Sequence, residues 1–288
     1  MSEKYQYGQK LSLQVKEILN SVHTKHSHVE YLETFNHGNV LIMDNEIQLS
    51  TLDEYRYHET LVHPVMKALS SFIDCPLNIL ILGGGDGCAA REVYKWGNVA
   101  SVTIVDYDEH FVSEFGRGHL SALNKHVYSR DSLSYVPEDV RSFLRTTSKK
   151  YDFVIIDLPD PDSPEMFCLY TECILLVKNV LRDPGGISIH VGPALLNPNH
   201  ENWDMISNFR DLLLHTFDRR NPSVALNTCY VPSFSNEWAF LNMVTNPDFL
   251  EADLPDEYHH VADKCRYWNP GCDYLLSADI REIYRRRL

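Results

Sequence analysis

Five aspartates lie at or just past the carboxyl ends of predicted strands and could together bind a cationic ligand. They are Asp86, Asp106, Asp131, Asp157 and Asp160. Any one of them could simply cap a helix or begin a turn. The carboxyl ends of parallel strands, however, meet at one edge of a sheet, so five acids there are expected to share a crevice. Crowded carboxylates need a compensating cation. Because no histidine or cysteine stands among them at ligand spacing, we expect an organic amine or sulfonium rather than a metal.

The first two acids belong to a strand, turn, helix, strand unit. Its parts are a strand at 79–82, a glycine turn at 83–87, a helix at 89–96 and a strand at 102–105 that ends on Asp106. This arrangement binds adenosine-type ligands at the carboxyl edge of a parallel sheet, where the second acid accepts the ribose hydroxyls. We therefore predict a nucleotide-type site here, in preference to a purely structural turn.

The rest of the chain alternates strands and helices. We expect helices within 11–19, at 51–69 (capped by Thr51 or Asp53, with a kink or break at Pro64), and at 108–115, 137–145, 170–181 and 201–217. We expect hairpins over 29–50 and strands at 151–157, 186–191, 223–231 and 237–244. This order predicts an α/β fold: a methyltransferase-like Rossmann domain, its mostly parallel sheet carrying a reversed edge strand, preceded by a small N-terminal β-hairpin domain. The predicted division is 1–52 for the hairpin domain, 53–246 for the Rossmann-like catalytic domain and 247–288 for a C-terminal extension.

Composition narrows the function classes. The chain has 288 residues, 44% of them hydrophobic, and so can bury a full core. No apolar run reaches the roughly 18 residues that span a bilayer, and the polar start lacks a signal peptide, which predicts a cytoplasmic protein without membrane contact. The net charge of -14 disfavours nucleic acid as a partner. Seven cysteines without a C-x-x-C pair fit a reducing compartment, and histidines 23, 26 and 28 are predicted to be solvated surface.

Four sequence blocks resemble one enzyme family. GGGDG followed by REV, DEYRYHETLVHP, YDFVIIDLPDP and the later PSF with its tryptophan are similar to the polyamine aminopropyltransferases, the spermidine, spermine and thermospermine synthases. The likeness runs from about Gly38 to Asn246. It implies transfer of an aminopropyl group from decarboxylated S-adenosylmethionine, as co-substrate, to a polyamine, leaving methylthioadenosine, with no metal or prosthetic group. It also implies a homodimer or homotetramer that associates through the hairpin region.

The resemblance assigns roles position by position. It places Gln48, His58, Gly83, Gly84, Gly85 and Gly87 against the donor, Asp86 on the ammonium of its aminopropyl arm, Asp106 on the ribose, and Asp131 with Ser132 at the adenine end. Asp157 stands at the general base position with Tyr57 beside it, and Asp160 would bind an ammonium of the acceptor. A base is needed because a protonated amine cannot attack carbon. The acids also explain the donor, because S-adenosylmethionine carries an extra carboxylate that Asp86 and Asp157 should repel.

Three positions depart from the usual family pattern. His26-Ser27-His28 replaces a Tyr-Gln pair that touches the nucleoside, Phe234 replaces a tyrosine of the spermidine synthases, and His190 replaces a glutamine. DLPDP, LYT, GPA and VPSFSNEW look more like thermospermine synthase, so we expect spermidine as acceptor, with Phe234 and His190 at its pocket and thermospermine or spermine as product. The alternatives are a spermidine synthase that uses putrescine, a methyltransferase that uses S-adenosylmethionine, and a non-catalytic polyamine or nucleoside sensor.

Overall fold

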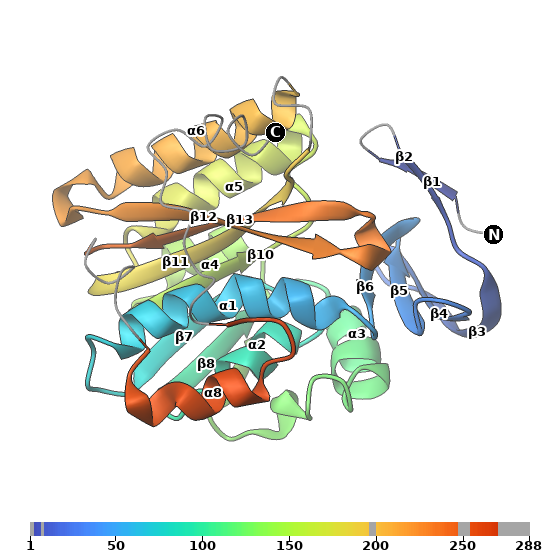
Figure 1. The fold of residues 1–288 in the computed structure, drawn as a ribbon, viewed down its shortest axis with the longest axis horizontal. Coiled ribbons are helices and arrows are strands. Elements are labelled where there is room, and N and C mark those ends of the chain that lie inside the picture. Colours follow the sequence, from blue (N-terminus) through green and yellow to red (C-terminus); the bar gives the residue numbers. More distant parts are fainter. Residues whose placement is uncertain (1–2, 7–8, 196–199, 247–253, 270–288) are drawn as a thin grey trace.

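The computed structural model describes residues 3–6, 9–195, 200–246 and 254–269 (Figure 1). A four-stranded antiparallel sheet lies beside a seven-stranded, mostly parallel sheet that has helices on both faces. Most of the predicted C-terminal extension, 247–253 and 270–288, lies outside the described residues. Within the described part, no helix is both long and apolar enough to cross a membrane.

The N-terminal part is built from antiparallel strands. They are β1 (Glu3–Gln6), β2 (Gln9–Ser12), β3 (Val15–His23), β4 (His28–Thr34), β5 (Asn39–Met43) and β6 (Glu46–Ser50), of which β3 to β6 form one sheet in that order. The predicted hairpins are confirmed, but the predicted helix within 11–19 is wrong. Strand β3 pairs with β4 along its length. Ile18 is 60% exposed and Leu19 37%, so these residues form no buried helical face, and pairing with β4 decides the local conformation.

The larger sheet carries the core. Its strands are β7 (Leu77–Gly83), β8 (Val99–Val105), β9 (Leu133–Val136), β10 (Tyr151–Asp157), β11 (Leu181–Pro193), β12 (Ser223–Val231) and β13 (Asn236–Val244), in the order β12-β13-β11-β10-β7-β8-β9. Strands β7 to β11 are parallel, whereas β13 runs antiparallel to both β11 and β12. The predicted fold class is confirmed. The reversed strand is not at the edge as predicted: β13 is second from the edge, because the β12–β13 hairpin places β12 outside it.

Helices cover both faces of this sheet (Figure 1). On one face lie α1 (Glu54–Ser70), α2 (Cys88–Val93) and, after the short turn η5 (Asp256–Tyr258), α8 (His259–Lys264); on the other lie α4 (Val140–Thr146), α5 (Pro164–Val177) and α6 (Glu201–Thr216). Past β8, α3 (Glu109–Phe111) continues as π-helical turns η1 (Val112–His119). Helix α5 begins six residues before the predicted 170, because Ser163 caps it and Pro164 starts it.

Helix α1 reaches the site with its first turns. Asp53 stands at its N-cap, but the carboxylate accepts hydrogen bonds from the amide (2.7 Å) and the hydroxyl (2.8 Å) of Ser233 instead of from the helix. These bonds tie the start of α1 to the short turn η4 (Pro232–Phe234). Pro64 lies inside the helix, which continues to Ser70 without the predicted break.

Candidate active site

A cavity of about 400 Å³ lies where the carboxyl ends of β7, β8 and β10 face the N-terminal sheet. The predicted site residues in its lining are Gln48, Tyr57, His58, Gly83, Gly84, Gly85, Asp86, Asp106, Asp157, Asp160, His190 and Phe234. The structure thus brings together residues from six separate elements. Gly87, Asp131 and Ser132 are not part of the lining.

The glycine turn fits tightly against the carboxylates. Gly83 (φ +81°) and Gly84 (φ +66°) adopt left-handed conformations that favour glycine. A Cβ atom on Gly83 would lie 2.1 Å from the carbonyl oxygen of Asp157, and one on Gly85 would lie 2.7 Å from a carboxylate oxygen of Asp106. The glycines therefore let the ends of three strands approach each other and the ligand space.

A Gly83→Ala substitution tests this requirement. We expect it to lower the free energy of unfolding by about 2–5 kcal/mol, because the new methyl group meets backbone at a strained φ. Urea denaturation measures the effect. Gly97→Ala is the matched control, since a Cβ there meets nothing within 4 Å, and a loss at Gly83 no larger than at Gly97 would contradict the prediction.

Asp106 follows β8 and is positioned by two amides. Gly85 N donates to its Oδ2 (3.2 Å) and Asp108 N to its Oδ1 (3.0 Å). Burial is the main cause that raises the pKa of Asp106 to about 6, with neighbouring carboxylates adding to it. A carboxylate held with both oxygens at a cavity wall can accept hydrogen bonds from two adjacent hydroxyls of a ligand.

Asp157 and Tyr57 form a hydrogen-bonded pair in the lining of the cavity. The Tyr57 hydroxyl donates to Asp157 Oδ1 at 2.8 Å. Burial raises the pKa of Asp157 to about 6; Asp86 adds to the rise and His58 opposes it. Burial and the same carboxylate also raise the pKa of Tyr57 well above its usual value, so the hydroxyl stays protonated. Asp157 can therefore take up a proton near neutral pH while Tyr57 holds it in place.

His58 joins the carboxylates from α1. Its Nδ1 lies 2.8 Å from Glu54 Oε2, and its Nε2 lies 3.9 Å from Asp86 Oδ1. Burial would lower the pKa of His58, but Glu54 and Asp86 outweigh it and raise the pKa to about 9. His58, Asp86 and Asp157 also present atoms within 4.8 Å of one another, and with its raised pKa the protonated His58 is itself the cation of this set. We expected no histidine among these acids. His58 is distant from them in the sequence, but the fold brings it beside them.

The other end of the cavity is more apolar. Phe234 lies there, with its ring centroid 6.3 Å from that of Tyr57 and 4.9 Å from that of Trp238. His190 Nε2 is 2.5 Å from the Leu158 carbonyl oxygen and therefore carries the hydrogen. Burial lowers the pKa of His190 to about 4, so the ring is neutral and Nδ1 is a hydrogen-bond acceptor.

The Nδ1 acceptor of His190 lies beside Asp160 at this end of the cavity. Among the described residues, His190 Nδ1 is buried without a hydrogen-bond partner, and it lies 3.9 Å from Asp160 Oδ1. Two acceptors at this separation suit one ammonium group, which can donate to both. A buried, unmet acceptor is costly, so a donor from the ligand would be favourable.

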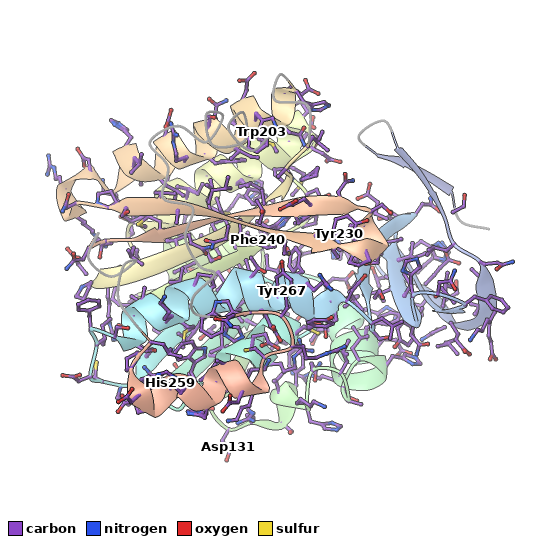
Figure 2. All side chains as sticks on the ribbon, in the orientation of Figure 1. Asp131, Trp203, Tyr230, Phe240, His259 and Tyr267 are labelled. Atoms are coloured by element: carbon purple, nitrogen blue, oxygen red, sulfur yellow. The ribbon has the colours of Figure 1, made fainter. Side chains whose placement is uncertain are left out.

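The positions of Asp131 and Ser132 contradict the prediction that they lie at the adenine end of the donor site. They precede β9, which begins at Leu133, and therefore lie at the amino edge of the sheet, opposite the cavity. Asp131 is exposed (Figure 2), and Ser132 Oγ lies 3.0 Å from the Tyr94 hydroxyl. Val140, the first residue of α4 after β9, lines the cavity instead.

Several lining residues were not predicted. Tyr107, Asp108 and Val140 follow β8 and β9, and their positions just past strand ends were the available signal. His26 and Ser27 also line the cavity, and the His26 ring packs edge-on against Tyr107 at 4.3 Å. His26 is exposed, as predicted, but it also lines the cavity, because the turn between β3 and β4 reaches the site.

Two family models match the chain. Residues 54–251 match the spermine/spermidine synthase domain, and residues 1–51 match the spermidine synthase tetramerisation domain. The chain is 33% identical over 254 residues to polyamine aminopropyltransferase 2 of Hyperthermus butylicus, covering 87% of this chain and 79% of that protein. It is 32% identical over 240 residues to the polyamine aminopropyltransferase of Sulfolobus acidocaldarius, covering 82% and 75%.

Solved structures with the same fold have low sequence identity. A spermidine synthase in complex with the transition-state analogue AdoDATO superimposes with a TM-score of 0.84 at 19% identity, covering 99% of this chain and 93% of the other. The spermidine synthase from Thermotoga maritima gives 0.78 at 19% identity, covering 99% and 92%. At this identity the likeness shows the fold.

Proposed function

The chain belongs to the spermine/spermidine synthase family of polyamine aminopropyltransferases, and from this membership we propose that it transfers the aminopropyl group of decarboxylated S-adenosylmethionine to an amine of spermidine. The observation that carries the proposal is the Asp157 and Tyr57 pair, held at 2.8 Å in a cavity that Asp86, Asp106 and Asp160 also line. Such a cavity favours a cationic donor and a cationic acceptor.

The donor would lie along the glycine turn. In this proposal Asp106 accepts hydrogen bonds from the ribose hydroxyls, Asp86 binds the ammonium of the aminopropyl arm, and Gln48 contacts the nucleoside from β6. His58, whose Nε2 lies 3.9 Å from Asp86 Oδ1, limits the repulsion among the acids. With Asp131 and Ser132 at the far edge, the segment around Val140 takes their place as the wall at the adenine end.

The reaction is a direct displacement at carbon. Asp157 accepts a proton from the attacking ammonium, and the freed nitrogen lone pair forms the new N–C bond. The C–S bond breaks as this bond forms, and its electron pair goes to sulfur, so the sulfonium leaves as neutral methylthioadenosine. Tyr57 keeps its proton throughout and holds the Asp157 carboxylate in line.

The acceptor end suits a polyamine, and the spermidine assignment rests on the resemblance of the surrounding loops to thermospermine synthase. Asp160 with His190 Nδ1 offers a place for one ammonium, and Phe234 with Trp238 offers apolar surface for a methylene chain. We propose thermospermine or spermine as the product, with putrescine as the alternative acceptor. No lysine or arginine is among the described residues that line the cavity, which disfavours a donor with a carboxylate and hence a methyltransferase.

A product assay tests this function. Purified protein is supplied with decarboxylated S-adenosylmethionine and with putrescine or spermidine separately, and the products are resolved by chromatography that separates spermine from thermospermine. Transfer to spermidine supports the proposal. Transfer to putrescine alone overturns the acceptor assignment, and transfer to neither overturns the activity and favours a non-catalytic sensor.

The pH dependence should report the raised carboxylate pKa values. Because burial raises the pKa of Asp157 to about 6, its basic form is lost as pH falls through about 6. We expect kcat at saturating donor to decline below about pH 6, well above the usual aspartate range. Asp106, whose pKa is also raised to about 6, should affect donor binding instead. A kcat that stays constant down to pH 5 would contradict the role of Asp157.

We also propose that 1–52, 53–246 and 247–288 are separate structural units, and that the first mediates assembly into a homodimer or homotetramer. The tetramerisation-domain match to residues 1–51 supports the second statement.

A further inference from the structure

A C-terminal segment outside the matched family domain covers the outer face of α1. Residues 256–268 comprise η5, α8 and the stretch that follows, and they run across α1 and α2 (Figure 1). Figure 2 labels Tyr267 on this face of α1 and His259 at the start of α8. The spermine/spermidine synthase match ends at residue 251, so it gives this segment no role.

Glu59 attaches this segment to α1. It is fully buried, and its carboxylate accepts three consecutive main-chain amides, from Arg266 (2.8 Å), Tyr267 (2.7 Å) and Trp268 (2.8 Å). Its fourth partner is Lys95 Nζ at 3.2 Å. Bonds from several amides to one buried carboxylate are strong, and replacing them leaves donors unmet.

Side chains of the segment pack on the neighbouring turns of the same helix. The Trp268 ring lies 4.9 Å from the ring of His63, and the Arg266 guanidinium lies 3.7 Å from the Tyr55 ring. Tyr55 and Glu59 stand on either side of Tyr57 and His58 in the sequence. Helix α1 is thus held between the C-terminal segment on one face and the reactive cavity on the other.

A buried chain of alternating charges joins these two faces. It runs from Glu59 through Lys95, Glu92, Arg91 and Glu54 to His58. The successive N to O distances are 3.2 Å, 2.5 Å, 2.7 Å, 2.8 Å and 2.8 Å. Every side chain in this chain is at most 16% exposed, so each depends on its neighbours for charge compensation.

The same region does not suit a metal ion. His63, Glu92 and Cys265 present ligand atoms within 4.8 Å of one another. Trp96 Nε1, however, donates to His63 Nδ1 at 3.0 Å, so Nε2 carries the hydrogen and donates to Glu92 at 2.9 Å. Lys95 already supplies the positive charge beside Glu92. The cluster is therefore satisfied as an anchor for the segment.

We propose that Glu59 is a positioning residue for the transfer reaction: by binding the amides of 266–268 on the outer face of α1 and Lys95 at the end of the charge chain, it fixes Tyr57 and His58 on the inner face. The proposal rests on the function proposed above for its effect on turnover. Its structural part, the coupling of Glu59 to His58, does not depend on that function.

The test is Glu59→Gln, with Glu257→Gln as control, since Glu257 is exposed on the same segment. Hydrogen exchange should show at least about tenfold less protection of amides 266–268, because an amide side chain cannot accept all three. The pH midpoint of the His58 ring, measured by NMR titration, should be lower than in the wild type. If the protein has the proposed transfer activity, kcat should fall roughly tenfold, because Tyr57 and His58 would no longer be held in position.

A shift in the pH dependence of kcat distinguishes a positioning role of Glu59 from a general loss of stability. The titratable groups facing Asp157 include Tyr57 and His58 from α1, Asp86 after β7, Asp106 after β8 and Tyr170 from α5. Of these, His58 is the cation that keeps the pKa of Asp157 down, so a displaced His58 should move the acid limb of kcat to higher pH. A protein that is merely less stable would lose rate without moving the limb.

Trp268→Ala provides a second route if Glu59→Gln does not fold. It detaches the segment from His63 without leaving a buried charge unpaired. We again expect the His58 titration to move to lower pH and the acid limb of kcat to move to higher pH. Lost amide protection with an unchanged His58 titration and an unmoved acid limb, in either variant, would overturn the proposal. If wild-type protein shows no transfer at all, the proposed function fails, while the His58 titration still decides the coupling.

Discussion

Replacing Asp157 with asparagine should lower kcat by roughly 10²- to 10⁴-fold, the contribution of a general base. The side chain keeps its shape and can still accept the Tyr57 hydroxyl, but it can no longer take a proton from the attacking ammonium. Rapid-quench measurement of the transferred aminopropyl group gives kcat directly. Donor affinity, measured by calorimetry, should change much less.

The Asp157→Asn protein should be as stable as the wild type. Burial raises the pKa of Asp157 to about 6, so the charged form is disfavoured in the folded state and its removal costs little. A thermal unfolding midpoint at or above that of the wild type therefore serves as the control. Undiminished turnover in this variant would remove Asp157 from the mechanism.

Asp86→Asn should have the largest effect on the choice of donor. Asp86 Oδ1 accepts the Cys88 amide at 2.6 Å, a bond that asparagine can keep, so the glycine turn should stay folded. The lost charge should weaken binding of decarboxylated S-adenosylmethionine by about 10- to 100-fold, the worth of a charged hydrogen bond. Binding of S-adenosylmethionine should weaken less, because its carboxylate is no longer repelled.

Competition calorimetry with the two donors measures this change in preference. Asp131→Asn is the matched control, because Asp131 is an exposed aspartate at the opposite edge of the sheet. It should leave both affinities unchanged. Equal losses for both donors in Asp86→Asn would show that Asp86 does not discriminate through charge.

The parts of the fold that follow from local pattern could be predicted. The run from Asn78 to Asp106 combines buried strands, glycines and an acid at fixed spacing, and the structure contains the predicted β7, α2 and β8. Strand β3 could not be predicted from its own residues. Its apolar side chains are largely exposed, and only pairing with β4 distinguishes it from a helix.

The misplacement of Asp131 has a similar cause. A short strand such as β9 has little apolar signal, so the sequence alone does not show on which side of it the acid falls. A shift of a few residues moves a side chain from the cavity to the opposite edge of the sheet. Asp139, which caps α4, marks the true carboxyl end of this strand.

Contacts between distant elements were beyond sequence reasoning. His58 could be placed on a helix near the donor, but its pairing with Glu54 and its approach to Asp86 depend on how α1 packs. Glu59 gave no signal, because its partners are backbone amides more than two hundred residues away, at 266–268. Almost every residue has a main-chain amide, so residue type does not indicate which amides will bind a carboxylate.

The shared construction of the cavity has a thermodynamic consequence. Gln48 on β6 and Ser27 in the β3–β4 turn belong to the N-terminal part, whereas Asp86 after β7 and Asp157 at the end of β10 belong to the seven-stranded sheet and its loops. A ligand that touches both stabilises their mutual orientation, and its binding adds RT ln(1 + [L]/Kd) to the free energy that keeps the two sheets together. An assembly that forms through the N-terminal sheet and favours the same orientation of the two sheets would be strengthened by the ligand to the same extent that assembly strengthens ligand binding.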